Sequence, residues 1–253
     1  MPTSNVTAEH AEYIVGNSGA GGSLAASANM TDGNVAGNTA NTWIPTYFLL
    51  SSFNLYYNYR AFAIFDLSST SGTATAVTLT LHRRTGASTP LLYFMAADCS
   101  DAVGTTDYLN GITGFDNTGD NPYEADGLSG LGDGGKLYTD SPWNPNADGG
   151  SSGDDVTITL NSNAITDVNS AIGSGKFKLV VVNTYDFNNT YGSSGLSDLA
   201  AVQGAYFSST QDGDSTLHPV LNITTSAVAD EPDITINIKA GKIIANGGSI
   251  KIN

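Results

Sequence analysis

The chain has 253 residues, of which 40% are hydrophobic and only 13% are charged. It carries 9 Lys and Arg against 24 Asp and Glu, and a formal net charge of −15 is the opposite of what a phosphate backbone attracts, so nucleic acid is excluded as a direct partner. A single cysteine excludes an internal disulfide framework and, with no second sulfur near it, a zinc site.

The length fits one large all-β domain, because sandwiches and barrels often reach this size. The 29 glycines and the scarcity of long charged side chains favour strands and turns over extended helices. The sequence does not open with a basic stretch and an apolar run, so we expect no signal peptide, and no apolar stretch is long enough to span a bilayer. Cys99 is expected to be a buried, unreactive thiol.

The first 42 residues predict a flexible N-terminal arm. Residues 15–42 are rich in small side chains and show no hydrophobic periodicity, and such a segment could become ordered against a neighbouring subunit. Residues 43–59 are dense in aromatic side chains, which predicts core, with part of the segment available for an interface or for stacking on sugars.

Residues 60–84 predict two consecutive strands. Apolar side chains fall on both sides of the first strand, which predicts cover on both faces: Phe62 and Ile64 on one side, and Ala61, Ala63, Phe65 and Leu67 on the other. On the second strand they fall on one side only, which is typical of a half-buried strand: Val77, Leu79 and Leu81. The polar loop between the strands is too long for a two-residue hairpin, so we expect a bulged or crossing connection.

The rest of the pattern predicts a two-sheet β-sandwich over residues 43–228, with jelly roll as its topology. Further strands are expected at 90–98, 156–160, 176–186, 204–209 and 218–224. One helical turn is expected within 161–175, where apolar residues at helical spacing precede a glycine that can end the helix: Ala164, Ile165, Val168, Ile172 and Gly173.

Residues 110–155 form a stretch rich in Asp, Asn and Gly, and connections of that length are functional or disordered. Oxygen ligands that could bind Ca²⁺ occur in this stretch and in a second acidic stretch, without the spacing of an EF-hand: Asp116, Asn117, Asp120, Asp212 and Asp214. Turn chemistry explains these Asp-Gly and Asn-Gly pairs equally well.

Two aromatic residues of the same stretch, Tyr123 and Trp143, could bind carbohydrate by stacking on sugar rings. The alternative for Trp143, which lies between prolines, is that it anchors the loop onto the sandwich.

Catalytic motifs are weak. An acid-rich loop contains pairs of carboxylates suited to glycoside hydrolysis by chance alone: Asp116, Asp120, Glu124, Asp126, Asp133 and Asp140. His10, His82 and His218 do not lie in a recognisable nucleophile motif. We therefore expect the protein not to be an enzyme.

Residues 229–253 predict a C-terminal assembly tail. Isoleucines alternate with polar residues between glycine turns: Ile234, Ile236, Ile238, Ile243, Ile250 and Ile252. Three short strands of this kind cannot bury their faces alone, so they need another surface, either a neighbouring subunit or their own sandwich.

Three segments resemble the DNRLRE-type jelly-roll module of bacterial and archaeal surface proteins and phage structural proteins. They are "RAFAIFDLSS" at 60–69, "ATAVTLTLHRR" at 74–84 and "GAYFSSTQDGDSTLHPVLNIT" at 204–224, whereas "LAAVQGAYFSS" stands in place of the motif that names the family. The likeness implies structural roles for charged residues at the strand ends. Arg60 would open a strand, Asp66 would accept N–H groups of the next loop, and Arg83 and Arg84 would pair with acidic loops.

The resemblance implies a virion setting, and packaging into a virion would also explain an exterior-type composition without a signal peptide. We expect a non-enzymatic structural protein on the virion surface of a tailed phage, as a capsid decoration, fibre or tail-associated protein. Its partners would be other copies of itself and other virion or surface-assembly proteins. The alternatives are a carbohydrate-binding adhesion module and, third, a polysaccharide hydrolase.

Overall fold

The structure is a computed structural model, and it describes residues 2–17, 35–37, 42–43, 47–50, 55–86, 91–104, 106–107, 111–112, 135–145, 147, 151–187 and 205–226. The strands are β1 Thr3–Thr7, β2 His10–Asn17, β3 Val35–Gly37, β4 Thr42–Trp43, β5 Tyr47–Leu50, β6 Leu55–Asp66, β7 Thr73–Gly86, β8 Leu92–Ala96, β9 Asp155–Thr159, β10 Lys176–Asn183, β11 Ala205–Ser208 and β12 Val220–Ser226. The helices are α3 Ser162–Ala171, α4 Thr184–Phe187 and the 3₁₀ helix η2 Ser215–Leu217.

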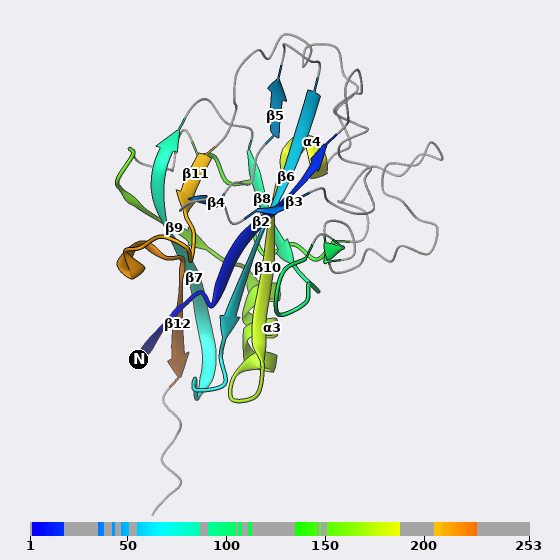
Figure 1. The fold of residues 1–253 in the computed structure, drawn as a ribbon. Helices are drawn as coiled ribbons and strands as arrows, with labels where there is room; N and C mark the ends of the chain where they lie inside the picture. The colour runs from blue at the N-terminus through cyan, green and yellow to red at the C-terminus, as the bar shows by residue number, and fades with distance from the viewer. Residues whose placement is uncertain are drawn as a thin grey trace, which may run out of the picture.

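The strands form two six-stranded sheets in which neighbours pair antiparallel (Figure 1). Sheet 1 has the order β1-β12-β7-β11-β4, with β9 also paired to β7. Sheet 2 has the order β3-β2-β6-β10-β8, with β5 also paired to β6. The all-β, sandwich-like architecture predicted from the sequence is confirmed.

The central strand of sheet 2, β6, is covered on both faces, as its sequence predicts. Its residues Ala61, Ala63 and Phe65 belong to the main core between the sheets. Phe62 and Ile64 belong to a second, smaller core on the outer face, where residues of the 99–112 segment cover them. This second core explains why the strand is apolar on both faces between Ala61 and Phe65.

The next strand, β7, has one apolar face. Val77, Leu79 and Leu81 are buried in the main core, as period-2 alternation predicts. Val77 and Leu79 lie opposite Ile223 and Leu221 of β12, and Leu81 lies opposite Val156 of β9. Since β6 lies in sheet 2 and β7 in sheet 1, their connection crosses from one sheet to the other.

Helix α3 contacts β7 and β10, strands of the two different sheets (Figure 1). It has ten residues, longer than the predicted single turn, and buries Ala164, Val168 and Ala171. The Asn161 side chain caps its first turn by accepting hydrogen bonds from the N–H groups of Asn163 and Ala164. Just after the helix, Gly173 has φ +79°, a conformation that other residues rarely adopt.

The sandwich begins earlier than the sequence predicts. β1 pairs with β12 from Thr3 to Thr7, and β2 pairs with β6 from His10 to Asn17. The arm predicted over residues 1–42 is therefore corrected: its first two strands are part of the two sheets, because Val6 and Ala11 pack on the main core. The tail predicted at 229–253 lies outside the described residues. In the part of the chain that is described, no helix is long and apolar enough to cross a membrane.

Candidate functional site

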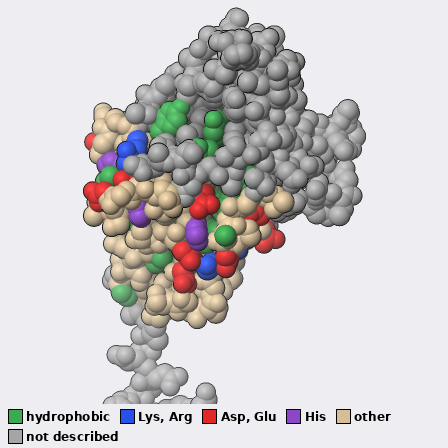
Figure 2. Space-filling view, viewed as in Figure 1, with side chains coloured by type: hydrophobic (Ala, Val, Ile, Leu, Met, Phe, Trp, Pro, Cys, Tyr) green, Lys and Arg blue, Asp and Glu red, His purple; other side chains and the backbone are tan. Residues whose placement is uncertain are grey.

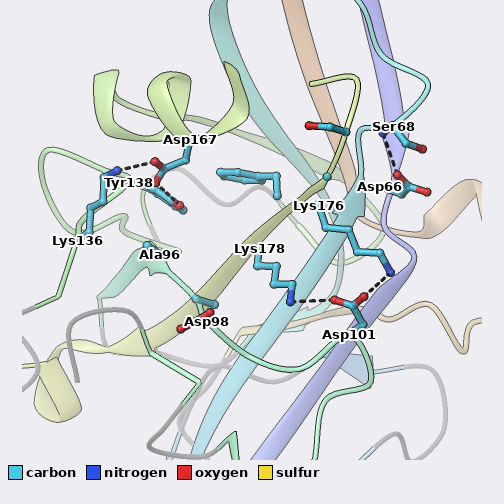
Figure 3. A pocket seen from close by; sticks show the side chains of 14 residues that line it. Asp66, Ser68, Ala96, Asp98, Asp101, Lys136, Tyr138, Asp167, Lys176 and Lys178 are labelled. Carbon is cyan, nitrogen blue, oxygen red and sulfur yellow. Dashed lines mark hydrogen bonds and ion pairs between the residues drawn. The ribbon is translucent and has the colours of Figure 1, made fainter. Parts of the chain in front are cut away.

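A pocket lies at an edge of sheet 2, along the part of β10 between Lys176 and Lys178 that extends past the end of β8 at Ala96. Its volume is about 690 Å³. Residues from β6, β8, α3, β10 and the connections between them line it (Figure 3): Asp66, Ser68, Ala96, Ala97, Asp98, Asp101, Lys136, Tyr138, Asp167, Ser174, Gly175, Lys176, Phe177 and Lys178. We call it the edge pocket.

On one side of the edge pocket, two lysines share one carboxylate (Figure 3). Alternation along β10 buries Phe177 in the main core and turns Lys176 and Lys178 outward. Asp101 Oδ1 lies 2.9 Å from Lys178 Nζ, and Asp101 Oδ2 lies 3.3 Å from Lys176 Nζ. Lys178 Nζ also donates to the Cys99 carbonyl at 2.6 Å. These contacts hold the two ammonium groups at the pocket wall.

On another side, α3 supplies Asp167, whose carboxylate joins two groups from the preceding connection (Figure 3). Lys136 Nζ donates to Asp167 Oδ1 at 2.6 Å, and the Tyr138 hydroxyl donates to Asp167 Oδ2 at 2.8 Å. The Tyr138 ring stacks on Phe177 with centroids 5.1 Å apart, which ties this group to the floor of the pocket.

Hydrogen bonds, neighbouring charges and burial shift the pKa values of four groups in the edge pocket. Hydrogen bonds from Ser68 lower the pKa of Asp66, and those from Lys178 and then Lys176 lower the pKa of Asp101. The Glu9 carboxylate, with Asp101, raises the pKa of Lys176. Burial, with the Asp167 hydrogen bond, raises the pKa of the Tyr138 hydroxyl. A general acid or base works best with a pKa near the operating pH, and all these shifts move away from neutrality.

On the face that Figure 2 shows, the described acidic and basic side chains lie close to one another. Figure 2 shows Lys and Arg side chains next to Asp and Glu side chains on this face, without a broad basic field. The exclusion of nucleic acid rests on the net charge of −15 and stays a prediction.

Trp143 is not an exposed platform for sugar stacking, which corrects that prediction. Only 9% of it is exposed, and its ring lies 6.4 Å from that of Phe94 and 6.0 Å from that of Phe207. Its backbone bridges to Leu92 of β8. This is the alternative role, an anchor that ties the loop to the sandwich. The second carbohydrate candidate, Tyr123, lies outside the described residues.

The two described calcium candidates serve a turn. Asp212 forms an ion pair with Arg84, and Asp212 Oδ1 accepts the N–H of Asp214 at 3.2 Å. Asp214 caps η2 by accepting from the hydroxyl and N–H of Thr216, and these bonds lower its pKa. Among the described residues, no cluster of three or more His, Cys, Asp or Glu side chains could hold a metal ion. The other three candidates, Asp116, Asn117 and Asp120, lie outside the described residues.

Two strand-end roles implied by the family resemblance agree with the contacts. Asp66 Oδ1 accepts the N–H of Ser68 at 2.9 Å, and Arg84 pairs with the acidic 212–214 turn through Asp212. Arg60 differs: it lies within β6, fully buried, and pairs with Asp186. Cys99 is buried, as predicted, and burial raises its pKa to about 12.

Sequence reasoning missed the edge pocket. Three lysines line it in a chain with only 9 Lys and Arg: Lys136, Lys176 and Lys178. The one local signal was the "KFK" at the start of β10, where two charges occupy the outward positions of an otherwise apolar strand.

The chain matches no protein-family model and no curated protein sequence. The likeness to the DNRLRE-type module therefore stays a prediction.

Proposed function

We propose that the chain is a non-enzymatic structural protein of a larger assembly, built on a jelly-roll sandwich that joins its neighbours through an open sheet edge. The observation that carries this proposal is strand β1, which pairs on one side with β12 and has no second partner among the described residues.

Natural proteins usually protect an edge strand with charged side chains, proline, bulges or short length. β1 has the sequence TSNVT, without charge or proline, and its five residues keep one unbroken register with β12 from Thr3 to Thr7. An edge strand without charge, proline or a bulge is suited to pairing with another chain, the mode called β-augmentation.

Strand β1 lies next to the point where the chain leaves β12 toward the C-terminal segment. Thr3 pairs with Thr224, and the Thr225 N–H donates to the Pro2 carbonyl at 3.0 Å, so β12 ends beside the start of β1. The segment after Ser226 includes "DITINIK", whose alternation is that of a strand. We propose that residues 229–253 of one copy pair with β1 of a neighbouring copy.

We propose that the chain is not an enzyme because the shifted pKa values in the edge pocket do not suit proton transfer near neutral pH. The pKa values of Asp66 and Asp101 are lowered and that of Lys176 is raised, so all three move away from neutrality. The virion surface of a tailed phage is proposed as the setting from the resemblance of residues 60–69, 74–84 and 204–224 to phage structural modules and from the exterior-type composition.

The test compares the full chain with a chain lacking residues 230–253 and with the β1 variant Asn5→Lys/Thr7→Lys. Sedimentation velocity over rising concentration should show oligomers of the full chain only, while circular dichroism shows all three folded. The matched control is Thr157→Lys/Thr159→Lys, which places the same charges on exposed positions of β9, another strand of sheet 1, and should still assemble. A full chain that stays monomeric, or a truncated chain that assembles like the full one, would refute the proposal.

A further inference from the structure

We infer that the edge pocket binds a neutral polyhydroxylated ligand, one or two sugar units, through hydrogen bonds from its paired charges. The inference goes beyond the assembly role and does not depend on it.

The first support is the balance of charge in the lining. Three lysines, Lys136, Lys176 and Lys178, face four aspartates: Asp66, Asp98, Asp101 and Asp167. An anion would meet an excess of carboxylates, and a bare cation at Asp101 or Asp167 would meet the ammonium groups already paired with them. A neutral ligand avoids both penalties, because it does not bring a net charge to be compensated.

The second support is hydrogen-bonding capacity that remains after the internal pairs are formed. An ammonium has three donors, and a carboxylate has about four acceptor sites. Lys136 Nζ and Asp167 make one ion pair with each other, and Asp167 accepts one further bond from Tyr138, so both retain capacity. Their side chains are 35% and 31% exposed, which leaves that capacity accessible from the pocket.

A hydroxyl group matches such a pair, because it donates and accepts at one atom. One sugar hydroxyl can donate to Asp167 and accept from Lys136, and another can do the same between Asp101 and Lys178 on the other wall (Figure 3). Bonds to charged groups are stronger than bonds between neutral ones, so a few of them can orient a small polar ligand.

The third support is shape. A volume of about 690 Å³ lies within the range of small-molecule sites, roughly 300 to 1,000 Å³. Ala96 and Phe177 belong to the main core beneath the pocket, so the groups that reach a ligand are mainly the polar ones. This mode differs from stacking on an exposed aromatic ring, which the buried Trp143 does not offer.

The test is an amide-resolved NMR titration of the full chain with glucose, galactose, mannose and N-acetylglucosamine at millimolar concentrations, and separately with sodium sulfate and calcium chloride. At least one sugar should shift the amide signals of residues 96–101, 136–138 and 174–178, and the shifts should saturate as its concentration rises. Neither salt should cause saturable shifts at these residues.

Two variants, Asp167→Asn and Lys178→Met, should each weaken that sugar at least tenfold, while Asp155→Asn, at an exposed ion pair outside the pocket lining, should bind it unchanged. A dispersed amide spectrum shows that each variant is folded, and Lys136→Gln replaces Asp167→Asn if the latter unfolds. Saturable shifts with sulfate or calcium alone, sugar shifts confined to other residues, or no sugar shift at all would overturn the inference. Loss of oligomers with intact sugar binding, or the reverse, separates this test from that of the assembly proposal.

Discussion

Arg60 and Asp186 form a two-point ion pair in which both side chains are fully buried. Arg60 Nε lies 2.8 Å from Asp186 Oδ2, and Nη2 lies 2.9 Å from Oδ1. Asn58 donates to Asp186 at 3.0 Å, and Asn183 donates to Asn58 at 3.0 Å. A buried polar cluster thus joins three elements: β6 through Asn58 and Arg60, β10 through Asn183, and α4 through Asp186.

We predict that Asp186→Ala lowers the free energy of unfolding by about 3 to 5 kcal/mol, because it leaves the Arg60 guanidinium buried without its carboxylate. Urea denaturation followed by circular dichroism measures the change. The control is Asp155→Ala, whose carboxylate is 67% exposed beside His82 and should cost less than about 1 kcal/mol. Equal effects of the two substitutions would contradict the prediction.

We predict that Trp143→Ala destabilises the fold by about 3 to 5 kcal/mol, because it opens a cavity between Phe94 and Phe207. Trp143→Phe keeps an aromatic ring there and should cost markedly less. The melting temperature of both variants measures the difference. If Trp143→Ala melted like the unaltered chain, the residue would not have the anchoring role that its burial indicates.

Much of the fold follows from short-range pattern. The two-sided apolar sequence of β6 and the one-sided sequence of β7 predict their burial, because alternation in a strand fixes which side chain faces which layer. The length of the loop between them left a bulged or a crossing connection open, and the structure has the crossing. The helix after Asn161 follows in the same way from the helical spacing of its apolar residues and from Gly173.

The remaining features depend on contacts between distant residues. β1 is short and mostly polar, and its identity as a strand depends on pairing with β12 at the other end of the described chain. The edge pocket combines Asp101, Lys136, Asp167 and Lys178 from separate elements, a juxtaposition that local spacing does not encode. Trp143 could be read from sequence as a surface ring or as an anchor, and only the packing distinguishes the two.

We predict that Cys99 reacts slowly with a thiol reagent in the native chain and rapidly after unfolding. Burial raises its pKa from 9.0 to about 12, which reduces the reactive thiolate by about a thousandfold at a given pH. The rate of reaction with a chromogenic disulfide, with and without urea, measures this. Comparable rates under the two conditions would mean that the thiol is not enclosed in the second core, of which Cys99 is a member.

We predict that the charges of the edge pocket make stability fall at both extremes of pH. Asp66 and Asp101 have pKa values below the ordinary 3.8, so the stability they supply is present above that pH and is lost as the pH falls through the lowered values. Lys176 has a pKa above the ordinary 10.5, so its contribution is present below that pH and is lost as the pH rises through the raised value.

Urea midpoints measured across pH check these signs. Asp101→Asn should reduce the drop of the urea midpoint at acid pH. It should also reduce the drop at alkaline pH, because the Asp101 carboxylate lies 3.3 Å from the Lys176 ammonium group. Asp66→Asn is the matched variant, because the pKa of Asp66 is lowered chiefly by hydrogen bonds from Ser68. It should reduce the drop of the urea midpoint at acid pH and have a smaller effect on the drop at alkaline pH. If the urea midpoint of both variants fell at acid pH as much as that of the unaltered chain, these carboxylates would not have the partners seen in the structure.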